Sequence, residues 1–459
     1  IRVCRTLREM AIPSVAIYSE ADQDAPHVFA ADEAYPAGPA PAAQSYLHAE
    51  RILEAARRAG ADAIHPGYGF LSESAAFAEE VERAGLVWIG PSPSAIKALG
   101  DKLSARAMAL RAGVPVLPGT ETPLSDEAEL RKAADRIGFP VALKAAAGGG
   151  GKGLRRVNTS DELAQALRLT QGEARNAFGD DRIYLERWLE RPRHIEVQLL
   201  GDAQGNVIAL GERDCSIQRR HQKLVEETPS PALDETRRKE PWGFAVKVAR
   251  AGGYTNAGTA EFLMDRSGKF YFLEVNARLQ VEHPVTEMVL GLDLVREQIR
   301  LAQGEPLPWT QEAVRPRGAS IGVRSGGQVP VHYDPLIGKI IVWGDTRDAA
   351  LSRAARALGE CVLSGIPNTL RFHRWLLEQE PFRSGGYDTS FVALEYKGQG
   401  PSDSAHEAED AAILAALHLH SISRGPRFSE SGDSARNGDA EQSRWRLAQP
   451  GLRAPWRPR

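Results

Sequence analysis

In the first hundred residues, apolar positions recur alternately with helical spacing and in short extended runs. The helical patterns end at Glu9 and cover residues 47–59, and the apolar runs cover residues 14–18, 63–65 and 87–89. Alternation of helix and strand patterns predicts a doubly wound α/β domain with a parallel sheet.

A different pattern lies between Phe272 and Pro284, where polar and apolar residues alternate strictly. Successive side chains of an extended chain point to opposite faces, so the even positions would form one polar row. The residues at these positions are Glu274, Asn276, Arg278, Gln280 and Glu282. Two acids, two amides and one guanidinium are unusual for a solvated edge strand, which makes this row a candidate site.

The segment just upstream predicts a β-hairpin that brings two acids together. Ser267 and Gly268 are turn residues between two extended runs, and a two-residue loop there places Glu261 opposite Glu274. Directly opposed residues have Cβ atoms about 4.5–5.5 Å apart, where like charges repel. A Mg²⁺ or Mn²⁺ ion, with the Asn276 carbonyl as a further oxygen ligand, would offset the repulsion. Solvated surface acids, or a register slip that separates them, are the alternatives.

Residues 141–157 combine two strand patterns with a glycine-rich loop. An apolar run carries Lys144 and leads into the four glycines 148–151 and Lys152, and a second strand pattern begins at Leu154. Glycine lets backbone amides approach an anion closely, and two lysines beside the loop favour a polyphosphate. The hydroxyl residue of the G-x-x-x-x-G-K-[ST] loop and the helix of a dinucleotide fingerprint are both missing. The segment is therefore a lid over a magnesium nucleotide or a plain flexible hairpin.

Five strings of the chain together resemble one family. They are H-P-G-Y-G-F-L-S-E-S (65–74), G-D-K (100–102), the lysine and glycine loop, E-R-D-C-S-I-Q-R-R-H-Q-K (212–223) and E-V-N-A-R-L-Q-V-E-H-P-V-T-E (274–287). In this order they resemble biotin carboxylase, the ATP-grasp component of biotin-dependent acyl-CoA carboxylases. Carbamoyl-phosphate synthetase shares the general ATP-grasp pattern, but the first and last strings favour biotin carboxylase.

The resemblance implies an ATP-grasp fold that combines α/β and α+β parts. We expect a doubly wound, Rossmann-like N-terminal domain at residues 1–100 and an ATP-grasp domain at 101–303, with a glycine-loop lid near 116–189. A C-terminal domain would follow at 304–396. Residues 397–459 show a helical pattern at 405–420 and then Ser-, Gly-, Asp- and Arg-rich sequence without periodicity, which predicts a disordered linker.

The resemblance also implies roles for individual residues. ATP would be bound by Lys102, Lys144, Gly150, Gly151, Glu186, Arg187, Leu189, His194, Gln218 and His221. Metal ions would be held by Glu261, Glu274 and Asn276. Bicarbonate would be held by Lys223, Arg278, Gln280 and the backbone of Val281, with Glu282 as its general base. Arg278 beside Glu282 could hold the anion in a bidentate fork while the acid takes its proton.

The reaction implied is the first half-reaction of an acyl-CoA carboxylase. MgATP phosphorylates bicarbonate to carboxyphosphate, and the CO₂ released from it carboxylates biotin. None of the four methionines adjoins a lysine, as the A-M-K-M site of a carrier would require. Biotin is therefore expected on a separate carrier and not covalently on this chain. Expected partners are the biotin carboxyl carrier domain, a second copy of the chain in a homodimer and a carboxyltransferase subunit.

Composition excludes several other classes of protein. The net charge of −3 gives no electrostatic footprint for nucleic acid. The three cysteines lie far apart in the sequence, which argues against a disulfide framework or a zinc site. No apolar run is long enough to span a membrane. A cytoplasmic location is expected, or the mitochondrial matrix in a eukaryote.

Two departures from the family pattern suggest an alternative function. The family begins with a strand and a glycine-containing loop before the helix that starts here at Ile1. After Gly318 it also has a few dozen further residues, including an arginine thought to stabilise the biotin enolate. Arg324 matches a position beyond that arginine, so we expect it to be missing. The alternative is a catalytically impaired or dead remnant that binds nucleotide or acts as a regulatory subunit.

Overall fold

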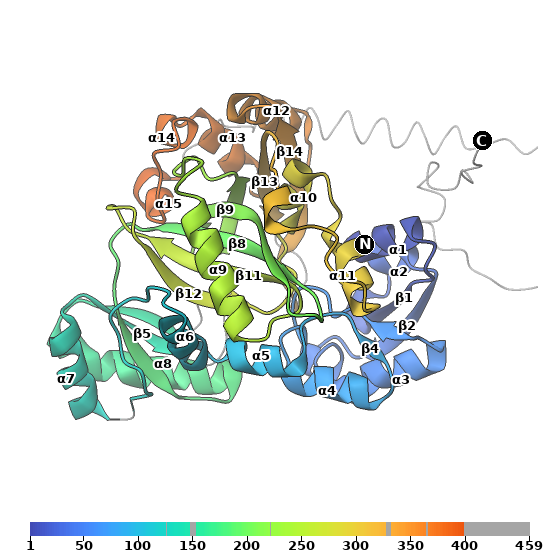
Figure 1. Ribbon diagram of the computed structural model, residues 1–459, viewed down its shortest axis with the longest axis horizontal. Coiled ribbons are helices and arrows are strands. Elements are labelled where there is room, and N and C mark those ends of the chain that lie inside the picture. Colours follow the sequence, from blue (N-terminus) through green and yellow to red (C-terminus); the bar gives the residue numbers. More distant parts are fainter. Residues whose placement is uncertain (125, 147–152, 221, 327–331, 364–365, 399–459) are drawn as a thin grey trace, which may run out of the picture. The chain divides into compact units, whose positions relative to one another are not determined.

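The computed structural model describes residues 1–398 except 125, 147–152, 221, 327–331 and 364–365 (Figure 1). Gly150, Gly151, His221 and the helix expected at 405–420 lie outside the described residues. The described residues form helices around four separate sheets. No helix among them is both long and apolar enough to cross a membrane.

The largest sheet has seven strands in the order β12-β11-β8-β9-β10-β13-β14 (Figure 1), and all neighbours in it are antiparallel. Its strands are β8 (Arg193–Gly201), β9 (Val207–Arg219), β10 (Gln222–Thr228), β11 (Asn256–Met264), β12 (Phe270–Asn276), β13 (Ala319–Gly326) and β14 (Leu336–Gly344). Strand β13, which begins where the family's additional residues were expected, lies between β10 and β14.

The two faces of this sheet differ because side chains alternate along each strand. On β8, Ile195, Val197 and Leu199 belong to an apolar core together with residues of α9 (Lys239–Ala251). Glu196 and Gln198 alternate with them and are fully buried. The helix α10 (His283–Leu290) packs against β9, β10, β13 and β14, and α11 (Leu294–Ala302) and a short 3-10 helix, Gln311–Ala313, follow it.

The hairpin of β11 and β12 places Glu261 opposite Glu274, as expected, but not by the expected loop. The Asp265 amide donates to the Lys269 carbonyl, so three residues form the loop and not two. The Asp265 carboxylate accepts from the Ser267 and Lys269 amides and stabilises this longer loop. An irregularity between Glu261 and Phe262 then shifts the register by one residue, which restores the predicted pair.

The expected polar row extends as a strand only to Asn276, where β12 ends. The prediction of an extended chain as far as Glu282 is wrong, because residues 277–282 turn into α10. Ala277 and Leu279, two apolar positions of this segment, are buried. Gln280 and Glu282 are also buried, at 2% and 7% exposure, so this row lies inside the protein.

A smaller α+β unit holds the glycine-rich segment. Its three-stranded antiparallel sheet has the order β6-β5-β7, and it has a separate apolar core. Its elements are α7 (Glu127–Ile137), β5 (Val141–Ala145), β6 (Leu154–Val157), a 3-10 helix Ser160–Glu162, α8 (Leu163–Phe178) and β7 (Ile183–Arg187). The strand pattern on both sides of the glycines is confirmed.

The N-terminal part alternates helix and strand and confirms the mixed class. Its four strands form two separate parallel pairs, β1 with β2 and β3 with β4, and not one continuous doubly wound sheet. The strands are β1 (Val15–Ser19), β2 (Glu33–Gly38), β3 (Ala63–Ile64) and β4 (Val87–Trp88). The helices are α1 (Arg2–Glu9), α2 (Pro26–Ala30), α3 (Ala49–Ala59), α4 (Ala75–Arg83), α5 (Pro93–Gly100) and α6 (Lys102–Arg111), with 3-10 turns at Glu20–Asp22 and Ala42–Gln44.

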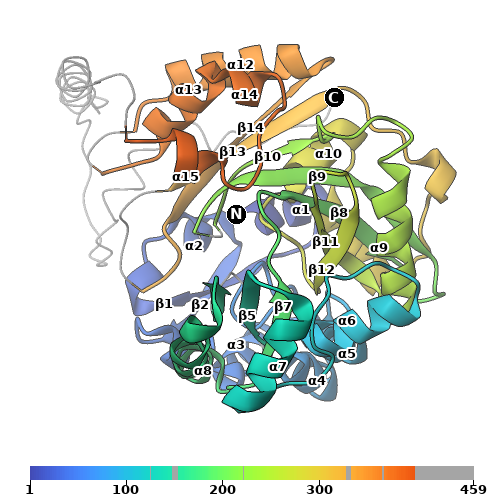
Figure 2. The same ribbon diagram turned by 90° about the vertical axis from the view of Figure 1, so that its left-hand side faces the viewer.

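Four helices follow the seven-stranded sheet along the chain, and Figure 2 shows them together beside β13 and β14. They are α12 (Arg347–Glu360), α13 (Leu370–Glu378), α14 (Glu380–Arg383) and α15 (Phe391–Glu395). Their apolar core includes Ile217, Leu224 and Val225 from β9 and β10. The sheet and these helices thus share one core.

Candidate active site

Lys223 of β10 lies at the centre of a buried cluster of carboxylates. Its Nζ donates to Glu196, to Glu261 Oε1 at 2.8 Å and to Glu282 Oε1 at 2.7 Å. The Lys223 side chain is 16% exposed, and the three acidic side chains are at most 9% exposed. An ammonium has three donors, so all three N–H groups of Lys223 have a carboxylate partner.

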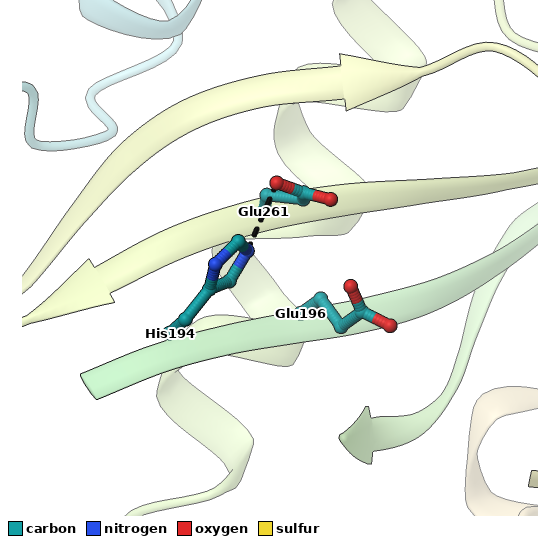
Figure 3. Close-up of side chains that lie close together, drawn as sticks. All are labelled: His194, Glu196 and Glu261. Atoms are coloured by element: carbon teal, nitrogen blue, oxygen red, sulfur yellow. Dashed lines mark ion pairs between the residues drawn. The ribbon is translucent and has the colours of Figure 1, made fainter. Parts of the chain in front are cut away.

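Glu261 also contacts a histidine and two amides. His194 Nε2 lies 2.9 Å from Glu261 Oε2, and Figure 3 shows this ion pair between β8 and β11 with Glu196 beside it. The side-chain amides of Asn276 and Gln280 donate to Glu261 Oε1 at 2.9 and 3.0 Å. Four residues named from the sequence, His194, Asn276, Gln280 and Lys223, therefore converge on one carboxylate.

These contacts shift the pKa values of the cluster. Burial raises the pKa of the Glu261 carboxyl, but Lys223 and His194 outweigh burial and hold it well below its usual range. The pKa of Glu282 is lowered in the same way, since Lys223, Lys339 and Arg213 outweigh its burial. Burial lowers the pKa of Lys223, but the three carboxylates together raise it well above normal. Glu261 and Glu282 are thus charged, and the lysine is protonated.

A second buried ion pair interacts electrostatically with Glu282. Lys339 Nζ of β14 is 2.6 Å from Glu226 Oε1 of β10, and the Glu226 side chain is fully buried. Burial raises the pKa of Glu226 more than Lys339 lowers it. Lys339 also acts on Glu282 electrostatically, so a residue of the C-terminal part contributes to the charge of the site.

Arg278 forms its ion pair with Glu73 and not with Glu282. Its Nε lies 3.1 Å from Glu73 Oε2, and its Nη2 donates to Asn276 Oδ1 at 3.0 Å. Glu73, the acid of the H-P-G-Y-G-F-L-S-E string, also accepts from the Ala277 amide. Arg278 also interacts electrostatically with Glu282, although its ion pair is with Glu73 of the N-terminal part.

The residues expected to bind ATP form two ion-paired groups. Lys144 Nζ donates to Glu186 Oε2 at 2.7 Å, and Arg106 Nη1 donates to the other oxygen at the same distance. Lys102, at the start of α6, lies 3.3 Å from Glu274. Both lysines therefore neutralise acids of the site, and phosphate groups could replace those acids as their partners.

Other residues expected at the site lie at or beyond the ends of strands. The Arg187 amide donates to the Pro118 carbonyl, so an adenine donor contact would have to come from the Leu189 backbone. Gln218 of β9 lies opposite Lys223 of β10 in the sheet register. Val281 is partly buried in the turn before α10.

The expected metal ligands have suitable chemistry for a hard cation. Glu261 and Glu274 are opposed in register, and each has a lysine Nζ within 3.3 Å of a carboxylate oxygen. Carboxylate and amide oxygens are the ligands that Mg²⁺ and Mn²⁺ prefer. The ligand atoms of His194, Glu196 and Glu261 also lie within 4.8 Å of one another, but Lys223 already contacts both of these acids.

Several residues of the site were missed in the sequence. Glu196 contacts Lys223, and Arg213 contacts Gln280. Glu73 pairs with Arg278, and Arg106 shares Glu186 with Lys144. Lys339 pairs with Glu226. Glu196 could have been found, because residues 194–199 alternate polar and apolar side chains as residues 274–282 do. Lys339 carries no such signal.

Comparison with known proteins identifies the family. Family models match residues 1–96 (biotin carboxylase, N-terminal domain), 101–310 (carbamoyl-phosphate synthase L chain, ATP binding domain) and 308–394 (biotin carboxylase C-terminal domain). The biotin carboxylase of Nostoc sp. is 48% identical over 427 residues, which cover 85% of this chain and 96% of the relative. A pyruvate carboxylase subunit of Methanothermobacter thermautotrophicus is also 48% identical, over 85% of this chain and 87% of its own.

Solved structures agree with this result. The Campylobacter jejuni biotin carboxylase, in a complex with β,γ-ATP, has a TM-score of 0.83 and 43% identity over 85% of this chain and 95% of its own. The biotin carboxylase domain dimer of Hydrogenobacter thermophilus 2-oxoglutarate carboxylase, with MgADP, ADP and bicarbonate, has a TM-score of 0.82, with 42% identity over 85% and 94%. Fold and site thus define an enzyme of the ATP-grasp class. Within that class, the chain belongs to the biotin carboxylase family.

Proposed function

We propose that this chain carboxylates biotin on a carrier protein, using ATP and bicarbonate by way of carboxyphosphate, as the first half-reaction of an acyl-CoA carboxylase. The observation that carries the proposal is the contact of Lys223 with Glu282 inside a buried cluster that also holds Gln280. A cation that binds the anion next to an acid that takes its proton is the arrangement that activation of bicarbonate requires.

The cluster suggests how Glu282 becomes a base. Bicarbonate can bind Lys223 only by taking one of the three N–H groups that the carboxylates hold. Glu282 is the partner most easily displaced, because Glu196 keeps its bond to Arg213 and Glu261 keeps its amide donors. Glu282 would then lose its closest cation, and its pKa would rise from the lowered value. The base is thus strengthened when the substrate arrives.

Phosphoryl transfer requires mainly positioning and neutralisation of charge. The ATP phosphates would replace Glu186 and Glu274 as partners of Lys144 and Lys102. A Mg²⁺ or Mn²⁺ ion held by Glu261, Glu274 and Asn276 would neutralise phosphate charge. The glycine-rich segment beside Lys144 would close over the nucleotide and exclude water, which protects carboxyphosphate from hydrolysis.

Bicarbonate-dependent hydrolysis of ATP by the purified chain tests the proposal. We expect bicarbonate to stimulate hydrolysis in the presence of Mg²⁺, and Glu282→Gln to lose the stimulation by about 10²–10⁴-fold, as expected for removal of a general base. Glu235→Gln, which changes an exposed acid, is the matched control. Hydrolysis that is indifferent to bicarbonate, or equal stimulation in the Glu282 variant, would contradict the proposal.

The proposed partners are a biotin carboxyl carrier domain, a second copy of this chain and a carboxyltransferase subunit. The Hydrogenobacter relative is a domain dimer, and relatives of this chain are named for pyruvate and 2-oxoglutarate carboxylases as well as biotin carboxylase. An acyl-CoA acceptor is proposed because residues 398–459 resemble the segment that follows the carboxylase domain in acyl-CoA carboxylase α-subunits. Carboxyl transfer to acyl-CoA, pyruvate or 2-oxoglutarate with the partner transferase would decide the acceptor.

The short connection around β13 favours a second candidate, a chain that hydrolyses ATP but carboxylates biotin poorly. The alignment with the Nostoc relative is 427 positions long, but it covers only 85% of this 459-residue chain, which is fewer residues than 427. The relative therefore has residues without a counterpart here. Arg324 of β13 forms an ion pair with Asp334. If the arginine that stabilises the enolate is missing, carboxylation of free biotin should fall about 10²–10³-fold relative to hydrolysis. Both rates measured on one preparation decide between the candidates.

A further inference from the structure

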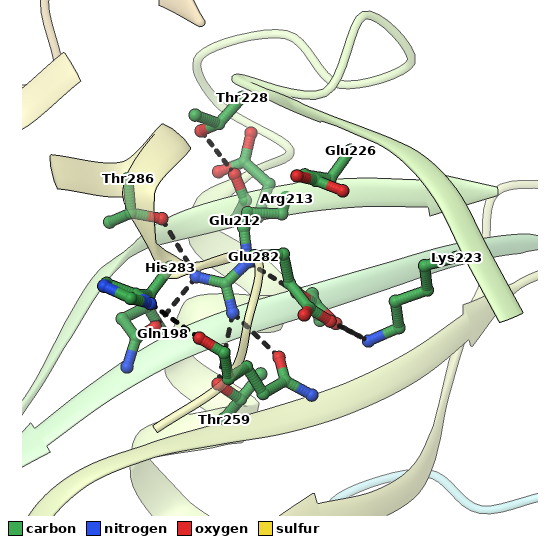
Figure 4. Close-up of polar contacts among 12 residues, drawn as sticks. Gln198, Glu212, Arg213, Lys223, Glu226, Thr228, Thr259, Glu282, His283 and Thr286 are labelled. Carbon is green, nitrogen blue, oxygen red and sulfur yellow. Dashed lines mark hydrogen bonds and ion pairs between the residues drawn. The ribbon is translucent and has the colours of Figure 1, made fainter. Parts of the chain in front are cut away.

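Arg213 of β9, in the E-R-D-C-S string, is a fully buried guanidinium to which the proposed reaction gives no role. Its five N–H groups donate to five acceptors on two strands, a turn and a helix. Figure 4 shows its guanidinium directed at Thr259 and Thr286, with Lys223 pointing toward Glu282 nearby. The acceptors are Glu196 Oε1 (2.5 Å), Gln198 Oε1 (2.8 Å), Thr286 Oγ1 (3.0 Å), Thr259 Oγ1 (3.2 Å) and Gln280 Oε1 (2.9 Å). Arginine has five donors and no acceptor, so its hydrogen-bonding capacity is filled.

We propose that Arg213 is a positioning residue for bicarbonate: it fixes which end of the Gln280 amide faces the anion, and through Glu196 it holds Lys223 in place. The inference rests on the proposed function, because it assigns a role at the same site. It adds a residue that acts through two others and does not touch the substrate.

The first argument concerns the Gln280 amide. Since Arg213 can only donate, the oxygen of Gln280 must face it, and the NH₂ group must face the other way. That group lies 3.0 Å from Glu261 Oε1, on the side where Lys223 also contacts Glu261. Gln280 therefore offers donors to an anion bound at Lys223. Without Arg213 the amide could turn over and present its oxygen, which would repel bicarbonate.

The second argument concerns Lys223. Glu196 is fully buried and is shared by two cations, with Arg213 Nε on one oxygen and Lys223 Nζ on the other. If Arg213 is lost, Lys223 becomes the one close cation that remains for Glu196 among its described ion pairs. The ammonium would then be drawn toward Glu196 and away from Glu282. Lysine in place of Arg213 keeps the charge but cannot reach five acceptors in one plane.

Steady-state kinetics of Arg213→Lys and Arg213→Met test the inference against a purely structural role. We expect the KM for bicarbonate to rise about tenfold or more in both variants, as for loss of hydrogen bonds at a charged site. The KM for ATP should change less than about threefold. Arg193→Lys is the matched control, because Arg193 is a largely buried β8 arginine paired with Asp214 at 2.8 Å, outside this site. It should leave both KM values unchanged.

Direct bicarbonate binding, followed by the thermal shift that bicarbonate produces, separates this inference from the proposed function. If the wild-type chain hydrolyses ATP with bicarbonate and the Arg213 variants keep their bicarbonate KM, the inference fails and the function stands. If the chain binds bicarbonate without hydrolysis, the function fails, and weaker binding by folded Arg213→Lys supports the inference. A parallel rise of both KM values, or a loss of activity that is proportional to the loss of folded protein, would show a purely structural role. Failure of the wild-type chain to bind bicarbonate would overturn both.

Discussion

Replacement of Lys223 by methionine should destabilise the protein strongly, and the loss should depend on pH. In the wild type, the Lys223 ammonium supplies the one ion pair that Glu282 forms among the described residues, at 2.7 Å. The other two acids keep partners, since Glu196 retains Arg213 and Glu261 retains His194. Removal of one partner of a buried pair costs about 3–5 kcal/mol because it leaves an uncompensated charge. We expect a loss of that size at pH 8.

The pH dependence follows from the pKa of Glu282. In the wild type this pKa is lowered. Ionised Glu282 therefore stabilises the fold at pH values above about 4.3, the usual pKa of a glutamate, and this stabilisation is lost as the pH falls further. In Lys223→Met the buried carboxyl loses its main cation, so its pKa should rise above the unfolded value. Stability of the variant should then fall as the pH rises through the raised pKa. The deficit relative to wild type should shrink between pH 8 and pH 5.5 by up to about 1.4 kcal/mol per pH unit.

Urea and thermal unfolding of both proteins at pH 8 and pH 5.5 measure this difference. Glu261 also raises the pKa of His194 despite burial, whereas Lys223 lowers it. The pKa of His194 should therefore rise further in the variant, which adds to the loss of stability as the pH rises. Lys132→Met, which removes an exposed lysine of α7, controls for the loss of a positive charge. A cost below about 1 kcal/mol at pH 8, or an equal cost at both pH values, would refute the reasoning.

Three further outcomes are expected. Glu274→Gln should abolish metal-dependent ATP turnover but leave metal-free thermal stability unchanged within about 1 kcal/mol, since relief of repulsion with Glu261 offsets the modest pair with Lys102; a large metal-free loss would assign Glu274 a structural role. Arg347→Met should cost about 3–5 kcal/mol in urea unfolding, because it leaves buried Glu227 without its guanidinium; a change below about 1 kcal/mol would contradict this. Streptavidin blotting of the purified chain should detect no covalent biotin, and a signal would place the carrier site on this polypeptide.

Much of the site could be predicted from local pattern, and the structure shows where that method fails. The opposition of Glu261 and Glu274 followed from counting along the hairpin, yet the count was right only because two deviations cancel. Asp265 closes a three-residue loop, and the register shift beside Glu261 compensates for it. Side-chain hydrogen bonds in the loop decide its length, and a turn dipeptide alone does not reveal them.

Other residues depend on which strands become neighbours. Lys339 reaches Glu226 because β13 inserts between β10 and β14, and no periodicity in either segment indicates that order. Arg213 lies in a string that was recognised, but its role depends on acceptors from β8, β11, the turn at Gln280 and α10. Glu196 is the opposite case, because alternation along residues 194–199 would have been sufficient to propose it, although it was missed.

The hydrogen bonds between β10 and β13 have a consequence for how the protein can be divided. A fragment that ends at residue 303, the domain boundary expected from the sequence, would lack the strand that pairs with Val225, Glu226, Glu227 and Thr228. Its β10 would become an open edge that can pair with other chains, and Glu226 would lose its ion pair with Lys339. The strand that carries Lys223 and the C-terminal part therefore belong to one sheet. Truncation between them would remove the strand that pairs with β10 two residues beyond Lys223.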